Sequence, residues 1–69
     1  MRYAVLFEKT ETGYSADVPD LPGCVAAGST FEETADLIRG AMRMHLAGIA
    51  EDGEAIPEPT TIAEYIVAA

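Results

Sequence analysis

The sequence is poor in the residue types that build reactive or cross-linked sites. It has one cysteine and one histidine among 69 residues. One cysteine excludes an intrachain disulfide, and one cysteine with one histidine cannot complete a closed metal site. The sequence contains no phosphate-binding loop, zinc signature or nucleophile elbow. We therefore expect no metal and no cofactor, and the lone cysteine favours a reducing compartment.

Long apolar runs are also missing. No run approaches the roughly 18 residues that a membrane-spanning helix needs. The first residues, MRYAVLFEKTE, reach acidic side chains too early for a secretory signal peptide. The sequence therefore predicts a cytoplasmic protein that does not associate with a membrane.

Basic residues are scarce. Four lysines and arginines stand against twelve aspartates and glutamates, which gives a net charge of −8. Such a charge repels phosphate backbones, so we expect no direct nucleic-acid binding by this chain. It favours a basic partner, and basic partners include proteins that themselves bind nucleic acid.

Hydrophobic residues, by contrast, are plentiful and make up 49% of the sequence. They are enough for the core of one small domain, which we expect to span residues 1–69. A chain of this size buries only about 60% of its unfolded surface. Its core supplies about 3–5 kcal/mol, and small folds usually add a further stabilising element. With disulfides and metals excluded, we expect a homo-oligomer, a dimer or tetramer, or a complex with a partner.

Alternating patterns predict three strands. Residues 2–9 and 14–18 alternate apolar and polar side chains on either side of a turn at Gly13, which indicates a hairpin. The prolines of PDLPG then interrupt the pattern, and CVAAG, residues 24–28, predicts a third short strand.

A long helix follows, with clear signals at both ends. Thr30 and Glu33 fit a capping box, and Gly53 fits a helix stop. After a proline-containing connector, IAEYIVAA predicts a closing segment that returns to the sheet. The expected fold is α+β, with order βββαβ: an antiparallel meander, one helix and a returning parallel strand.

Two pairs of residues have side chains that could take part in catalysis. Cys24 and His45 are the sequence's only thiol and imidazole, but the acidic surroundings disfavour a thiolate. We interpret Cys24 as a small buried residue and His45 as a partly buried helix residue. Asp17 and Asp20 could form an acid–base pair, although aspartates beside prolines more often serve turns. The sequence therefore predicts no enzyme.

The predicted helix carries a second apolar stripe beside its core stripe, formed by Leu37, Ala41, Met44 and Gly48. Gly40 lies in the helix interior, where glycine costs about 1 kcal/mol relative to alanine. Either another backbone approaches the helix there, or the helix tolerates the glycine. For self-association we expect the exposed sheet edge together with Leu37, Met44 and Gly48.

Three marks, in this order, resemble the N-terminal domain of HicB-family antitoxins. They are GYSADVPDLPGC at 13–24, a helix start at Gly28, Thr30, Glu32 and Glu33, and a tail mark at Gly53, Ile56, Pro57 and Pro59. The resemblance covers residues 2–60, nearly the whole chain. It implies a partial RNase H-like fold and a function as an antitoxin for a small, basic, mRNA-cleaving toxin of the HicA type.

The sequence departs from that family in two places. Family members often carry a C-terminal DNA-binding domain, and because the sequence ends at Ala69 we expect no operator binding by this chain. Gly40 stands where relatives tend to have a longer charged residue. The RNase H likeness implies no nuclease, because that chemistry needs several converging carboxylates and the outer strands offer only Glu8 and Glu64.

Two hypotheses follow. In the first, the chain is an antitoxin that covers a HicA-like toxin, with contacts expected at Asp17, Asp20, Glu32 and Glu33. In the second, it is a stand-alone homo-oligomeric binding or adaptor module without a toxin. An adjacent reading frame that encodes a small basic protein with one central histidine would favour the first.

Overall fold

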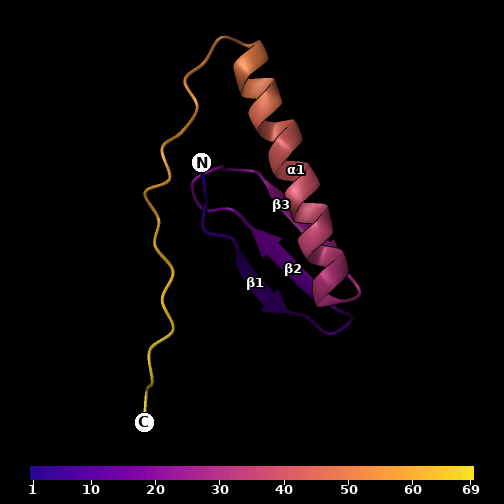
Figure 1. Ribbon diagram of the computed structural model, residues 1–69. Helices are drawn as coiled ribbons and strands as arrows, with labels where there is room; N and C mark the ends of the chain where they lie inside the picture. The colour runs from indigo at the N-terminus through magenta and orange to yellow at the C-terminus, as the bar shows by residue number, and fades with distance from the viewer.

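A three-stranded antiparallel sheet carries one long helix across one of its faces (Figure 1). The computed structural model describes all 69 residues, with strands β1 (Leu6–Lys9), β2 (Tyr14–Asp17) and β3 (Val25–Gly28) followed by helix α1 (Phe31–Glu51). The strands lie in the order β1-β2-β3. The predicted α+β fold, a meander followed by one helix, is confirmed.

The strands are shorter than the alternating pattern predicted, most clearly at the start of the chain. Only Leu6–Lys9 of the expected strand 2–9 pairs, because its partner β2 ends at Asp17. The next residues turn away into a loop at Pro19, which has no N–H to donate to a ladder. Residues 2–5 therefore have no strand to pair with on that side.

The core lies where the proline-containing loop meets the helix and the sheet. Its buried apolar residues are Ala16, Val18, Leu21, Cys24 and Ile38. The loop closes on itself through backbone bonds, in which Leu21 N–H donates to Val18 O and Cys24 N–H donates to Leu21 O, both at 3.0 Å. Gly23 completes this turn with a φ of 85°. A segment that breaks the sheet thus supplies much of its core.

Both predicted ends of the helix are confirmed. The Thr30 side chain accepts a hydrogen bond from Glu33 N–H at 3.0 Å, and the Glu33 carboxylate accepts one from Ser29 N–H at 2.6 Å. At the other end Asp52 is the C-cap, and Gly53 follows with a φ of 72°. At the start of the helix, the bonds made by Thr30 and Glu33 satisfy amide groups that have no partner within the first turn.

Gly40 lies in open space, since a Cβ built on it would meet no atom within 4 Å. We therefore expect Gly40→Ala to raise the free energy of unfolding by about 1 kcal/mol, because alanine favours the helix. Urea denaturation followed by circular dichroism measures this change. Gly53→Ala is the matched control and should lower stability, because its positive φ disfavours a side chain. A destabilised Gly40→Ala variant would contradict the expectation and indicate a second backbone packed on the helix.

The predicted returning strand is not formed within this chain. Residues 54–69, here called the tail, are extended and carry no strand, and none of the backbone hydrogen bonds outside the elements joins them to β1. The tail runs beside β1 in the same direction but separate from it (Figure 1). A strand requires paired backbone groups, and from Ile62 onward the tail stands away from the sheet, with its large apolar side chains exposed.

Candidate partner-binding surface

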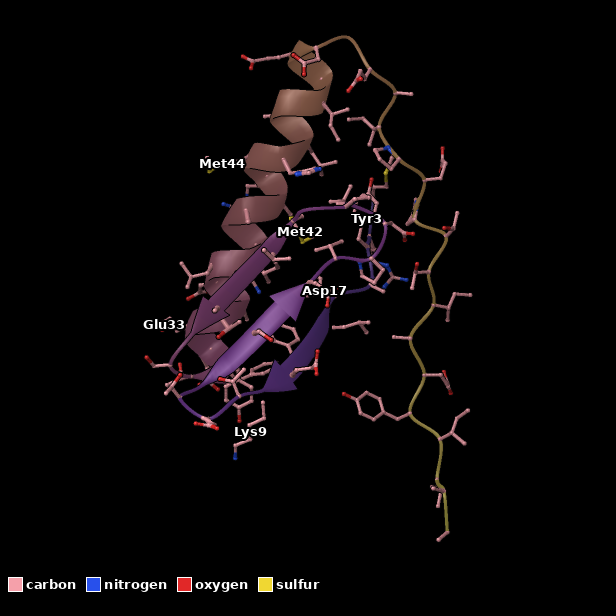
Figure 2. All side chains as sticks on the ribbon, turned by 180° about the vertical axis from the view of Figure 1, so that it is seen from behind. Tyr3, Lys9, Asp17, Glu33, Met42 and Met44 are labelled. Atoms are coloured by element: carbon pink, nitrogen blue, oxygen red, sulfur yellow. The ribbon has the colours of Figure 1, made fainter.

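The four acidic residues expected to contact a partner do not form one patch. Figure 2 shows Asp17 at the end of β2 and Glu33 at the first turn of α1, well apart. Asp20 lies in the loop after β2, and Glu32 lies beside Glu33 on the exposed first turn. Each acid therefore lies in surroundings of its own.

Glu33 and Asp20 both hold parts of the chain in place. Glu33 caps the helix through Ser29 N–H. The two Asp20 carboxylate oxygens accept four hydrogen bonds from the tail: from the backbone N–H groups of Thr60 and Thr61, each at 3.0 Å, and from their hydroxyls at 3.0 and 2.9 Å. The backbone N–H of Thr61 has the largest effect in lowering the pKa of Asp20 below its ordinary value of 3.8. Asp20 is thus a tether for the tail.

A second contact holds the tail nearby. The Tyr3 hydroxyl donates a hydrogen bond to the Pro57 carbonyl oxygen, across 54 residues of sequence. Together with Asp20 it fixes the middle of the tail, residues 57–61, beside the first residues of the chain. No local pattern in the sequence predicts these contacts, because the two partners of each one lie at least 40 residues apart along the chain.

Acid should release this tether. The folded pKa of Asp20 lies below 3.8, so the four bonds contribute in full above that pH and are lost as the pH falls through the folded pKa. We expect the Thr60 and Thr61 amide NMR signals to shift toward random-coil positions below pH 3.8. Asp20→Asn, which has no charge to lose, should show no such transition. A transition centred above 3.8 in the unmodified protein would contradict this assignment.

Asp17 occupies a different setting, on the sheet face that the helix leaves open. Phe7, Ala16 and Ala26 pair across the strands and pack on the helix side. On the opposite side Asp17 lies between its cross-strand partners Leu6 and Val25. We name this side the outer sheet face; its strand residues are Leu6, Glu8, Ser15, Asp17, Val25 and Ala27.

The outer sheet face combines a central acid with exposed apolar neighbours. Leu6 is 42% exposed and Val25 is 63% exposed. Ser15 and Ala27, next to them on this face, have short side chains, so a partner can approach the sheet closely. Such a mixture suits docking of a basic protein, since apolar contacts supply area and the carboxylates supply complementary charge.

The two candidates for catalysis are not brought together. Cys24 is buried, and burial raises the pKa of its thiol. No hydrogen bond joins Cys24 to His45, which lies on α1. The structure has no group of three or more His, Cys, Asp or Glu residues placed to hold a metal ion. Nor does it have a helix with the length and apolar character to span a membrane.

The helix residues expected to self-associate lie away from the sheet. Met44 points outward and Met42 toward the sheet in Figure 2. Leu37 and Met44 are 48% and 78% exposed, and a Cβ on Gly48 would meet no atom within 4 Å. Nothing in the single chain covers this face, and its role in self-association stays a prediction.

A family model described as the HicB-like antitoxin of bacterial toxin–antitoxin systems matches residues 3–69. The chain belongs to this family. The match extends through the tail, which includes the threonines held by Asp20 and the exposed segment after them. Two of the marks noted in the sequence therefore meet in space: the loop with Asp20 holds the threonines that directly follow the tail mark.

The chain is also similar to individual proteins, one of which is named as a HicB antitoxin. The chain is 39% identical over 66 residues to a 14.9 kDa protein from the rep-hol intergenic region of Haemophilus phage HP1, covering 96% of this chain and 50% of that protein. It is 37% identical to Antitoxin HicB 2 of Photorhabdus laumondii over 97% of this chain and 48% of the relative. A UPF0150 protein of Thermoplasma acidophilum is 38% identical, with 83% of this chain and 84% of that protein covered. The chain thus spans about half the length of the first two relatives.

Proposed function

We propose that this HicB-like chain is an antitoxin that binds a small, basic, mRNA-cleaving toxin of the HicA type and covers its active site. The family match over residues 3–69 is the observation that carries the proposal. The net charge of −8 supports it, because an acidic protein competes with RNA phosphates for a basic surface and is steered toward it. We place this encounter in the cytoplasm, where the messenger RNA is.

The outer sheet face is the surface we assign to the toxin. Asp17 is its central acid, and its carboxylate is not engaged by any hydrogen bond within the chain. Asp20 and Glu33, by contrast, are held by the tail and the helix start. Glu32, on the exposed first turn, adds negative charge but lies off this face. We therefore expect Asp17 to contribute more to toxin binding than the other three acids.

Co-expression with the basic protein encoded in the adjacent reading frame tests the proposal. We expect the two proteins to copurify and the chain to restore growth. Asp17→Arg should slow association about tenfold and reduce its salt dependence, because the charge that attracts a basic partner is reversed. Glu11→Arg makes the same charge change in the exposed turn between β1 and β2, away from the outer sheet face, and should have a smaller effect.

Absence of a complex and of growth rescue, with both proteins folded, would overturn the proposal. The stand-alone adaptor hypothesis would then gain support, especially if the adjacent frame encodes no small basic protein. Equal effects of Asp17→Arg and Glu11→Arg would retain the antitoxin but move its binding surface away from the outer sheet face.

A further inference from the structure

The end of the tail is the most exposed apolar segment of the molecule. Within residues 62–67, Ile62 is 89% exposed, Tyr65 102%, Ile66 82% and Val67 88%. The whole chain has only six buried residues. A contiguous apolar segment of this kind on a small protein marks an interaction site.

The edge of β1 is open along the whole strand. β1 pairs with β2 on one side, and no backbone hydrogen bond joins its other side to any segment. An unpaired edge presents a row of N–H and C=O groups that can add a further strand. The structure therefore has an unpaired strand edge and an unpaired extended segment.

A groove lies between this edge and the helix. It measures about 500 Å³, and its apolar lining includes Val5, Phe7, Phe31, Ile38 and Met42. A smaller hollow of about 260 Å³ shares Val5, Phe7 and Phe31 and is bounded on its far side by Ala63, Glu64 and Tyr65 of the tail. Side chains of a strand added at the β1 edge would enter the groove, because alternate residues of that strand face the helix.

Charge and length both match the end of the tail. Arg2 lines the groove and has no salt-bridge partner, whereas Arg39, also in the lining, pairs with Asp36 at 2.8 Å; Glu64 is the one acid within residues 62–67. Six extended residues span about 20 Å. Residues 3–9, which form β1 and its approach, are of similar length. The segment and the groove are thus complementary in polarity as well as in size.

The tethers hold the segment near the β1 edge without pairing it. Tyr3 and Asp20 hold residues 57–61 beside the start of β1, and the residues after Thr61 continue beside the strand (Figure 1). No backbone hydrogen bond joins them to β1, so one copy leaves both the edge and the segment unpaired. A second copy can supply a partner for each of them.

We propose that residues 62–67 pair with the β1 edge of a second copy and fill its groove, in a reciprocal exchange that forms a dimer. Each exchanged segment places Ile62, Glu64 and Ile66 in the groove, pairs its backbone with β1 and covers a comparable area of the receiving copy. Two such contacts bury on the order of 1,200–2,000 Å², the size of a stable interface. This dimer leaves the outer sheet face free for a toxin and does not depend on the antitoxin function.

Sedimentation equilibrium on the 69-residue chain tests the exchange. We expect twice the 7.3 kDa chain mass at micromolar concentrations. The double variant Tyr65→Asp, Ile66→Asp should sediment as a monomer with an unchanged circular dichroism spectrum. Val25→Asp, Ala27→Asp adds the same two charges on the outer sheet face, away from the β1 edge and the helix, and should remain dimeric. A monomeric unmodified protein, or a tail variant that stays dimeric, would overturn the proposal.

Crosslinking between copies separates exchange from closure within one chain. An untagged Glu8→Cys chain and a tagged Val67→Cys chain are refolded together and treated with a short bismaleimide. We expect a product with the mass of both chains, while the unmodified protein, whose Cys24 is buried, should give none. If a chain with both substitutions crosslinks only within itself, the tail closes on its own sheet and the proposal is wrong.

Discussion

Leu21→Ala is expected to remove most of the protein's free energy of unfolding. Leu21 is fully buried, with 0% exposure, although it lies in a loop between two prolines. It packs in the core cluster with Val18, Cys24 and Ile38. Truncating a buried leucine to alanine costs about 2–5 kcal/mol. Since a core of this size supplies about 3–5 kcal/mol in all, that loss removes most of its stability.

Urea denaturation of dilute protein, followed by far-UV circular dichroism, measures the effect. Leu37→Ala removes the same atoms from a helix residue that is 48% exposed and should change the free energy of unfolding by less than about 1 kcal/mol. If Leu21→Ala unfolds at a urea concentration close to that of the unmodified protein, the core does not depend on this loop. The stability would then have to come from the contacts between the helix and the sheet.

The position of Leu21 illustrates which parts of the fold could be predicted from the sequence. The caps at Thr30 and Gly53 were predictable, because the residues that interact there are neighbours in the chain. The alternating patterns identified the three strands but not the start of β1. A strand extends only as far as its partner, and β2 ends at Asp17.

The candidate site was less predictable for the same reason. In the sequence Asp20 looks like any surface acid. Its role as a tether depends on threonines 40 residues away. Asp17 was identified as a surface acid, but its apolar neighbours Leu6 and Val25 come from other strands and follow only from the register. The end of the tail, IAEYIVAA, was expected to return to the sheet as a strand, yet whether it pairs depends on a partner that one chain does not provide.

Gly13→Ala should be the most damaging of the glycine substitutions. A Cβ at Gly13 would lie 2.1 Å from Gly28 O and 2.8 Å from Ser29 Cα. Both are backbone atoms, so no side-chain rotation relieves the clash. The end of β3 and the helix start would have to move away from the β1–β2 turn, next to the pair that Tyr14 makes with Gly28. We expect a cost of about 3 kcal/mol, at the upper end for overpacking.

Alanine substitutions at two other glycines, Gly28 and Gly48, allow the stabilities of the three variants to be ranked. At Gly28 a Cβ would lie 2.7 Å from Thr34 Oγ1, 2.8 Å from Glu33 Oε1 and 3.1 Å from Thr34 N, contacts less severe than the 2.1 Å at Gly13, and the Glu33 carboxylate can move away. Gly28→Ala should therefore cost less than Gly13→Ala, mainly through the weakened cap. At Gly48 nothing lies within 4 Å, and alanine there should stabilise the helix. The urea midpoint should therefore be highest for Gly48→Ala, lower for Gly28→Ala and lowest for Gly13→Ala. A Gly13→Ala variant as stable as the unmodified protein would mean that the hairpin turn and the helix start separate without cost.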